Sequence, residues 1–331
     1  RSRPSNKQTS TASAAGAQSA KLVPSWVTCA PNLWGSAGLT LVSNHPREVK
    51  VLNWNAVLLT SSISGMKIAI CVKQVPDSWA EKKMVGGRLD RESVDAVLND
   101  LDEYAIEEAL RIIEPLNEGK ETPEHSITLI SMGPERTTEA IRKGLSMGAD
   151  NGLLVSDAAL AGSDAIATAK VLAKVIKDGG FDLVFCGTES TDARMSVIPA
   201  MLSESLGWAQ LTFAGSVKVD VATKSVEIAR MTESGVENMS ATLPCVVSVI
   251  EKINEPRYPS FKGIMAAKKK QIDTKTLIDI GITASEVGAS GAWSEVLEAN
   301  PRPAREKGVK LEDSGDGGTK LADYLLEKRL V

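Results

Sequence analysis

From Met66 onward, two kinds of apolar pattern follow one another along the chain. Short, nearly continuous apolar runs are typical of strands buried on both faces of a parallel sheet. Apolar residues three and four positions apart predict amphipathic helices. Strands are predicted at 67–75, 126–132, 152–155 and 181–186, and helices at 101–113, 137–147, 164–176 and from about 192 to 205. This alternation indicates right-handed βαβ units and an α/β fold, with a Rossmann-like, mostly parallel sheet and helices on both faces.

The pattern changes after Trp208. Short alternating segments predict a small antiparallel insertion at 216–220, 225–231 and 236–241. A buried strand is predicted at 243–250, and residues 255–270 begin as a loop and become a short helix.

The two ends of the chain differ from this middle part. Residues 1–65 are Ser-rich, contain six Lys or Arg and one acidic residue, and show no sustained period. Such a stretch is typical of a transit peptide. A tag or mistranslated leader before a start at Met66 is the interpretation that we prefer, because Met66 opens directly into a strand. Residues 282–331 are predicted to form an extended arm with a terminal helix at 320–330. The α/β domain then spans 66–281.

Composition and charge exclude several classes of function. The 331 residues carry 38 Lys or Arg and 42 Asp or Glu, a net charge of −4, which argues against a nucleic-acid-binding protein. No apolar window approaches the roughly 18 residues of a membrane span, so the chain is not expected to be membrane-embedded. The two histidines, His45 and His125, are far apart, and the cysteines form no CxxC. A zinc site or thiol redox motif is therefore not expected. Three cysteines lie in apolar runs, typical of small buried side chains: Cys71, Cys186 and Cys245.

Open α/β sheets bind ligands beyond the carboxyl ends of their strands. Three predicted strands end at 71–73, 132–133 and 186–187, and the loop from Gly187 then opens a helix for which Thr191 or Asp192 is the expected N-cap. A helix N-terminus carries free N–H groups and a partial positive charge, which suit a phosphate. An ordinary capped helix start is the alternative. The chain has neither a P-loop motif nor a GxGxxG fingerprint.

Five motifs, in order, resemble the beta subunit of electron transfer flavoproteins, and together they span nearly all of the chain after residue 65. They are Cys71–Asp77; Asn99 with Asp102–Ala109; Gly133 and Pro134 with Ala140–Asp150; Ile228–Arg230 with Glu233, Gly235, Glu237 and Leu243–Val247; and Asn254–Lys270.

The resemblance implies an electron carrier without catalytic residues of its own. It would be half of a heterodimer whose alpha subunit holds most of the FAD, while the beta subunit holds a structural AMP. The pair would take electrons from acyl-CoA and related dehydrogenases, as in fatty acid beta-oxidation, and pass them to a quinone oxidoreductase. A bacterial cytoplasm is the expected location, or the mitochondrial matrix if residues 1–65 are a transit peptide.

The resemblance also implies a set of AMP contacts, which makes 66–281 a nucleotide-binding domain. They are Cys71, Asn99, Asp100, Leu101, Asp102, Met132, Gly187, Thr188, Glu189, Ser190, Thr191, Asp192, Ala193, Arg194, Met195, Ser196, Val197 and Ile198. The stretch 192–198 departs from the acidic and Asn/Gln/Thr series of many members. Ser190, Thr191 and Ser196 remain as side-chain donors. A second FAD in place of AMP, as in bifurcating relatives, stays open. Met231 stands where an acidic residue often follows the arginine.

Two further regions are implied to contact partners. Trp79 or Leu101 is expected to face the edge of the flavin. The docking segment for dehydrogenases comprises Pro256, Arg257, Tyr258, Phe261, Ile264 and Met265. In it Phe261 occupies the position of the family's apolar anchor. The arm at 282–331 is expected to wrap the alpha subunit.

Two other classes of protein stay open. A stand-alone adenine-nucleotide sensor would use the same helix N-terminus without an alpha subunit. A ligase that adenylates its substrate would need SGGxDS after the first strand, where this chain reads VKQVPD at 72–77.

Overall fold

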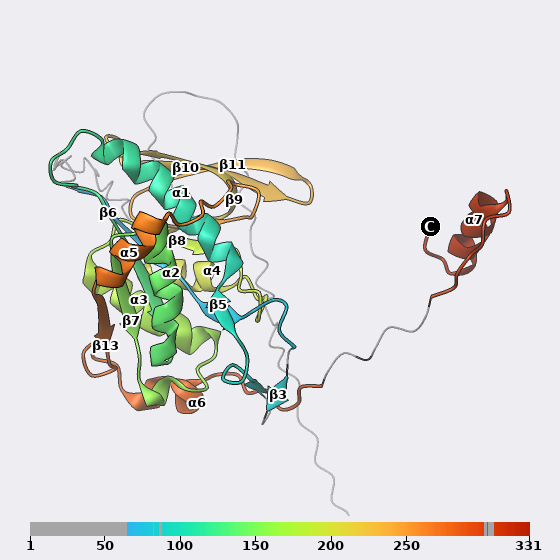
Figure 1. The fold of residues 1–331 in the computed structure, drawn as a ribbon, viewed down its shortest axis with the longest axis horizontal. Helices are drawn as coiled ribbons and strands as arrows, with labels where there is room; N and C mark the ends of the chain where they lie inside the picture. The colour runs from blue at the N-terminus through green and yellow to red at the C-terminus, as the bar shows by residue number, and fades with distance from the viewer. Residues whose placement is uncertain (1–64, 82, 86–87, 301–302, 304–307) are drawn as a thin grey trace, which may run out of the picture. The chain divides into compact units, whose positions relative to one another are not determined.

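The computed structural model describes residues 65–331 except 82, 86–87, 301–302 and 304–307. Its centre is a nine-stranded sheet (Figure 1). In spatial order the strands are β11 (Gly235–Thr242), β10 (Ser225–Thr232), β9 (Ala209–Asp220), β12 (Cys245–Val249), β8 (Leu183–Gly187), β1 (Lys67–Cys71), β6 (Ser126–Met132), β7 (Asn151–Val155) and β13 (Ile272–Lys275). Neighbours from β9 to β13 are parallel, and β9, β10 and β11 pair antiparallel. The predicted α/β fold class and its antiparallel insertion are confirmed.

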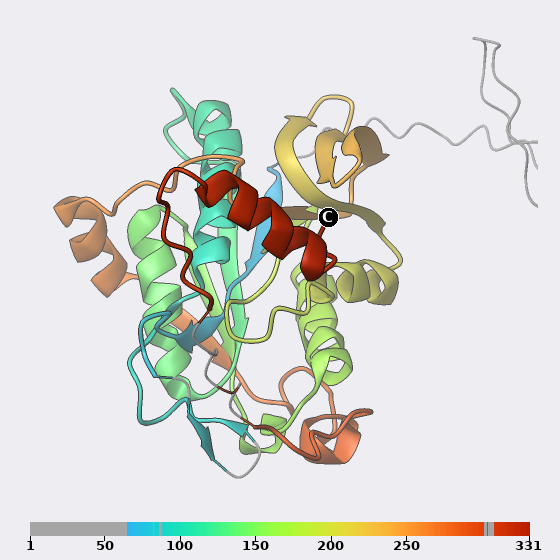
Figure 2. The ribbon, with the colours of Figure 1, turned by 90° about the vertical axis from the view of Figure 1, so that its right-hand side faces the viewer.

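Helices cover both faces of this sheet, as Figure 2 shows. The helices of the described residues are α1 (Asp100–Asn117), α2 (Thr138–Met147), α3 (Ala165–Gly179), α4 (Ile198–Leu206), α5 (Phe261–Lys269), α6 (Gly288–Gly291) and α7 (Gly317–Glu327). Single 3-10 turns lie at η1 (Glu135–Thr137), η2 (Ala158–Leu160) and η3 (Ala284–Glu286). Two small antiparallel pairs complete the fold: β2 (Gln74–Pro76) with β5 (Ala96–Leu98), and β3 (Met84–Val85) with β4 (Arg88–Leu89).

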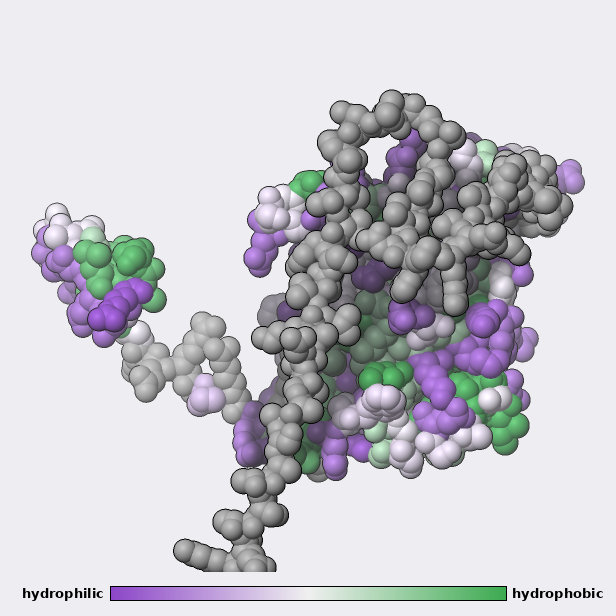
Figure 3. Space-filling model, turned by 180° about the vertical axis from the view of Figure 1, so that it is seen from behind, coloured by the Kyte–Doolittle hydropathy of each residue, from purple (hydrophilic) through white to green (hydrophobic). Residues whose placement is uncertain are grey.

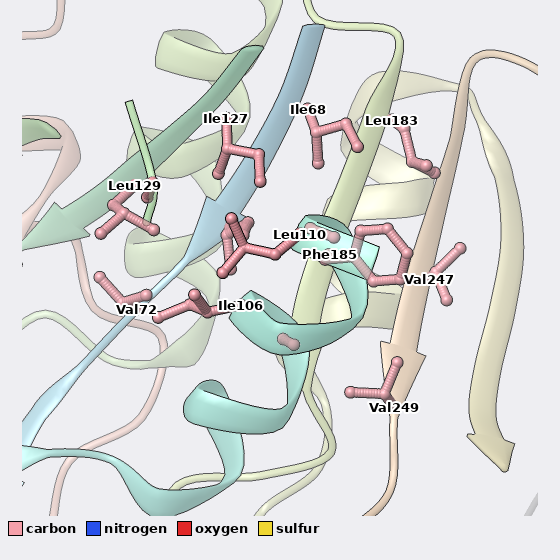
Figure 4. Close-up of a cluster of buried hydrophobic side chains, with 14 of the residues drawn as sticks. Ile68, Val72, Ile106, Leu110, Ile127, Leu129, Leu183, Phe185, Val247 and Val249 are labelled. Atoms are coloured by element: carbon pink, nitrogen blue, oxygen red, sulfur yellow. The ribbon is translucent and has the colours of Figure 1, made fainter. Parts of the chain in front are cut away.

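The central strands are buried on both faces because each face carries its own helical layer. On one face Ile106 and Leu110 of α1 pack against Ile68 and Phe185 (Figure 4). On the other face Ala69 and its neighbours pack under α3 and α4. Alternate residues of one strand therefore enter different cores, which explains the nearly continuous apolar runs of the sequence.

The first predicted strand, 67–75, is divided in the structure. β1 ends at Cys71, and Gln74–Pro76 leaves the main sheet to pair with β5. Val75 is buried beneath this small pair. Because β1 and β2 are both largely buried, the apolar run of the sequence continues across the break between them. The run therefore does not show where the chain passes from the main sheet to the small pair.

Two strands differ from the prediction, one in its length and one in not having been predicted. β9 begins at Ala209, seven residues before the predicted start, because its first half pairs parallel with β12 and its second half antiparallel with β10. Phe213 lies at the shift in register with φ +60. β13 was not predicted, since its four residues are too few to show a period.

The arm expected from residue 282 differs from the structure at its start. Ile282 and Val287 are buried in the core under α3. The N–H of Gly288 donates to Ser163 Oγ at 2.8 Å, and that of Trp293 to Asp164 Oδ2 at 2.8 Å. Gly288 has φ +63, and a Cβ there would lie 2.0 Å from the Ala159 carbonyl oxygen. The first part of the predicted arm is therefore packed.

The terminal helix α7 has no buried residue, and its side chains form an apolar face and a polar face (Figure 3). No helix in the described residues is long and apolar enough to cross a membrane. The predicted leader, 1–65, lies almost wholly outside the described residues, and the proposed division into three parts stays a prediction.

Candidate functional site

Three strand ends that are distant in sequence meet in the middle of the sheet. β8, β1 and β6 are neighbours, and Cys71 is in register with Cys186 on one side and Ile130 on the other. Cys71 and Met132 are half-buried, and Gly187 is buried. The structure thus brings together three of the residues that the sequence placed in one site.

The start of α1 is tied to the loop that follows β8. The Asn99 side chain is fully buried, donates to the Glu189 carbonyl at 3.0 Å and accepts from the Thr191 N–H at 3.0 Å. Asn99 also donates to Asp102 Oδ1 at 2.9 Å. One amide therefore joins two of the predicted site segments, 99–102 and 187–198, and fixes the path of the loop.

Asp102 connects this amide with the ends of β1 and β8. Its Oδ2 accepts the Lys73 N–H at 2.8 Å. Burial raises the pKa of Asp102 to about 7, although hydrogen bonds from Asn99, Lys73 and Gly187 lower it. A Cβ at Gly187 would lie 2.6 Å from Asp102 Oδ1, so only glycine allows this close approach.

A second buried carboxylate, Asp192, holds the tip of the loop. Lys73 Nζ binds Asp192 Oδ1 at 2.8 Å and Ser190 Oγ at 3.1 Å, and Arg91 pairs with the other oxygen. Burial raises the pKa of Asp192, but the charge and hydrogen bond of Lys73 outweigh it and hold the pKa well below its ordinary value. Asp192 is therefore ionised and bound within the protein.

The predicted cap of α4 is wrong. The helix begins at Ile198, with Val197 as N-cap and no side-chain cap, so neither Thr191 nor Asp192 caps it. Pro199 occupies the first turn, where its missing N–H costs nothing. The Asp192 side chain instead accepts from Lys73 Nζ, and the Thr191 backbone N–H donates to the Asn99 side chain, so both residues are held in the loop before the helix starts.

Backbone N–H groups are the free donors that this loop offers. Arg194 and Ser196 have φ +50 and +55, and left-handed residues within a turn direct successive N–H groups to one concave side. The N–H groups of Ala193, Met195 and Ser196 donate to no acceptor in the described part of the chain. Such donors fit a phosphate or the acceptor atoms of a nucleotide base.

Of the predicted side-chain donors, Ser196 is engaged, and Ser190 Oγ accepts a hydrogen bond from Lys73 Nζ. Ser196 Oγ donates to Glu189 Oε2 at 3.0 Å, and Arg194 lies 3.5 Å from Glu189 Oε1. Thr188 Oγ1 donates to the Val249 carbonyl at 2.6 Å. Ala193 and Met195 are exposed, as is Asp100, whereas Leu101, Val197 and Ile198 are half-buried. Backbone contacts therefore carry more of any ligand binding than these side chains do.

Sequence reasoning missed Arg91 and the role of Lys73. Arg91 comes from a long loop without periodicity, and Arg136 holds that loop by donating to the Arg91 carbonyl at 2.7 Å. Lys73 lies two residues after the apolar end of β1. A polar residue at this position is expected at the carboxyl ends of the strands, and this is the signal from which Lys73 could have been predicted. Nothing in the sequence signals the pairing of Arg91 with Asp192 across 101 residues.

The predicted docking segment contains one residue bound to the body of the protein. The Arg257 guanidinium bonds Glu107 Oε2 at 2.7 Å and Glu114 Oε1 at 2.5 Å, both on α1. Bonds to Glu114 and Glu107 raise the pKa of Arg257 above its ordinary value. Asn254 donates to the Tyr104 carbonyl at 3.1 Å. These contacts fix residues 254–257 on the side of α1.

The rest of that segment presents apolar side chains. Tyr258 is 95% exposed and Phe261 80%, and Ile264 and Met265 on α5 are also exposed. Pro256 is half-buried. Lys268 and Lys269 follow in the last turn of α5. The segment combines exposed apolar groups with positive charge on a rigid support.

Trp79 and Leu101 differ in their surroundings. Trp79 is 96% exposed and lines a pocket of about 450 Å³ with Asp77, Asp100, Glu103 and Lys143. Leu101 is half-buried, and its carbonyl carbon would lie 2.8 Å from a Cβ at Gly187. Trp79 is the side chain of the two that is free to contact a partner.

Comparison with known proteins agrees with these features. Residues 86–280 match the family described as the electron transfer flavoprotein domain. The electron transfer flavoprotein subunit beta of Mycobacterium leprae (strain TN) is 47% identical over 267 residues, 80% of this chain and 99% of the relative. That of Mycobacterium tuberculosis (strain ATCC 25618 / H37Rv) is 46% identical with the same coverage. That of Megasphaera elsdenii is 33% identical over 272 residues, 80% of this chain and 97% of the relative. The chain therefore belongs to the electron transfer flavoprotein family, as a member of its beta-subunit branch.

Proposed function

We propose that this chain pairs with an alpha subunit and holds a structural AMP beside the FAD that the alpha subunit carries. The heterodimer would accept electrons from acyl-CoA and related dehydrogenases and pass them to a quinone oxidoreductase. The beta-subunit relatives at up to 47% identity support the pairing. The chain itself supplies surfaces and a nucleotide site rather than catalytic groups.

The observation that carries the nucleotide proposal is the loop of residues 188–197. It follows β8, is anchored beside the end of β1 through the bonds of Lys73 with Asp192 and of Asn99 with Glu189, and leaves backbone N–H groups free. AMP offers a phosphate for such donors and a base with acceptor nitrogens. Because the cations Lys73 and Arg91 are already paired with Asp192, they add little net charge for a diphosphate. This balance favours AMP over a second FAD.

Electron donors would dock on the segment 256–265. An exposed aromatic anchor on a polar loop suits a transient contact, in which one buried side chain supplies much of the binding free energy. Phe261 meets this description, and Arg257 keeps its loop in place. Lys268 and Lys269 would steer acidic partners toward it.

The apolar face of α7 would pack on the alpha subunit. Leu321 and Leu326 of this helix are 50% and 63% exposed. A helix that buries none of its apolar side chains gains little stability unless they are covered. A partner surface would cover them.

The test is to co-express the chain with a candidate alpha subunit and count the nucleotides released from the purified, denatured complex. One FAD and one AMP per heterodimer are expected. Two FAD and no AMP would contradict AMP binding and would indicate a bifurcating variant that binds a second flavin. An adenine nucleotide on a chain that forms no complex would favour a stand-alone sensor and overturn the heterodimer.

A further inference from the structure

Two cysteines lie side by side at the mouth of the site, although 115 positions separate them in the chain. β1 and β8 are parallel neighbours, and Cys71 is directly in register with Cys186. Neighbouring strands lie about 4.8 Å apart. The Cα atoms of a disulfide are usually about 4.4 to 6.8 Å apart. The register therefore brings two thiols to a separation that a disulfide can span.

Both side chains project from the same face of the sheet. Cys186 belongs to the core under α3 and α4, and Cys71 packs against that core. Their chain neighbours Ala69 and Val184, two residues earlier on each strand, belong to the same core. The two thiols thus face the same space and are not divided by the backbone.

The environments of the two thiols differ. Cys186 is 4% exposed, whereas Cys71 is half-buried at the edge of the site. A hydrogen bond with Cys71, together with burial, raises the pKa of Cys186 well above its ordinary value. Cys186 therefore keeps its proton, and an oxidant from solvent meets Cys71 first.

We propose that Cys71 and Cys186 form an oxidation site at which hydrogen peroxide produces an intrachain disulfide. The Cys71 thiol loses its proton, and its sulfur attacks one peroxide oxygen. The O–O bond breaks, and the leaving hydroxide takes up that proton as water, which gives a sulfenic acid. The Cys186 sulfur then displaces the sulfenic oxygen, and the thiol proton of Cys186 leaves with that oxygen as water. In total two thiols lose two electrons, and one peroxide becomes two waters.

The disulfide would tie β1 to β8 where the nucleotide loop begins. Gly187 follows Cys186 directly, and Lys73, which holds the loop through Asp192, follows Cys71 by two residues. Formation of the bond does not depend on a bound nucleotide. Protection of Cys71 by added AMP does rest on the proposed function. The two effects are therefore measured separately.

The full chain, reduced and then treated with hydrogen peroxide, is alkylated and digested without reductant, and its peptides are analysed by mass spectrometry. A peptide pair linked through Cys71 and Cys186, lost on treatment with dithiothreitol, is the expected product. Cys71→Ser and Cys71→Ala should each abolish it. Cys245→Ser is the matched control, because Cys245 is buried on β12 among side chains of the opposite face, and the variant should leave the cross-link intact.

Three outcomes would overturn the proposal. They are no cross-link, oxidation of Cys71 only to sulfinic or sulfonic acid, and a disulfide to Cys29 in place of Cys186. If the cross-link forms at the same rate with and without AMP, the oxidation site stands and nucleotide binding over Cys71 is contradicted.

Discussion

At the scale of single residues, the surroundings of Asp102 act on the pKa of its carboxyl group in two opposite ways. Its carboxylate is enclosed by the protein and accepts hydrogen bonds from the Asn99 amide and from the backbone at the ends of β1 and β8. Hydrogen-bond donors stabilise the ionised carboxylate and lower its pKa, whereas burial destabilises the ionised carboxylate and raises its pKa. The balance leaves the pKa of Asp102 at about 7, far above the ordinary value of 3.8.

This raised pKa predicts a pH-dependent stability. Between pH 3.8 and about 7 the folded state keeps a proton on Asp102 that the unfolded state releases. The free energy of unfolding should therefore fall as pH rises through this window, by up to about 1.4 kcal/mol per pH unit. Urea unfolding from pH 5 to 8 measures the slope. Asp102→Asn cannot titrate and should lack this component, whereas equal slopes in both proteins would contradict the assignment.

Gly187 allows the backbone of β8 to approach α1. In Gly187→Ala the new Cβ would lie 2.6 Å from Asp102 Oδ1 and 2.8 Å from the Leu101 carbonyl oxygen. We expect a loss of about 1 to 3 kcal/mol in the free energy of unfolding, as for other overpacked sites. Gly318→Ala is the control, since no atom lies within 4 Å of its Cβ position. Similar stability of the two variants, measured by urea unfolding, would show that the approach tolerates a methyl group.

At the scale of elements, α1 serves two regions at once. Asn99 and Asp102, at its N-terminus, hold the loop of residues 188–197. Two and four turns further on, its Glu107 and Glu114 hold residues 254–257 through Arg257. Seven residues separate these glutamates, which places them on one face of the helix. One rigid helix thus positions both regions relative to the sheet.

The Arg257 ion pairs should matter more than their surface position implies, because the Glu107 side chain is only 5% exposed. Arg257→Gln leaves that carboxylate poorly paired, and we expect a loss on the order of 2 kcal/mol. Amide hydrogen exchange at residues 254–260 should become faster. Arg111→Gln removes another bond to Glu107 within α1 and should cost about 0.5 kcal/mol. Exchange that is unchanged in Arg257→Gln would show that other contacts hold the loop.

Phe261→Ala tests the docking anchor at the start of α5. With the complex intact, the KM of electron transfer from a dehydrogenase should rise about tenfold, the effect of losing about 1.4 kcal/mol of binding. Ile278→Ala removes an apolar side chain that is 88% exposed but lies outside the docking segment. The anchor role fails if both variants transfer electrons with the same KM as the unchanged chain.

At the scale of the whole molecule, the proposed contact of α7 with an alpha subunit predicts that the arm is protected in the complex. Limited trypsin digestion compares cleavage after Lys310 and Lys320, both exposed, with and without the alpha subunit. Bound alpha subunit should slow both cleavages at least tenfold. Equal rates would show that the arm does not contact it, and an unrelated flavoprotein serves as the control for non-specific protection.

Most of the fold could be predicted because local patterns in the sequence determine most of its strands and helices. Buried strands such as Ser126–Met132 and helix ends such as Gly148 follow from apolar runs and capping preferences. The failures lie where a neighbour in space decides the outcome. β9 is longer than its own period indicates because β12 lies beside it. α4 starts later than predicted because Lys73 binds the Asp192 side chain and Asn99 accepts from the Thr191 backbone N–H, which holds both residues in the preceding loop.

The sequence by itself determined the α/β class, the strand ends at which a ligand site is proposed and the family to which the chain is similar. These depend on local periodicity and on motifs that are contiguous in the chain. Only the tertiary structure decided which side chains meet: Arg91 with Asp192, Arg257 with Glu107, and Cys71 with Cys186. Such pairs depend on strand order and register, which fold residues about 100 or more positions apart into contact without leaving a periodic signal in the sequence.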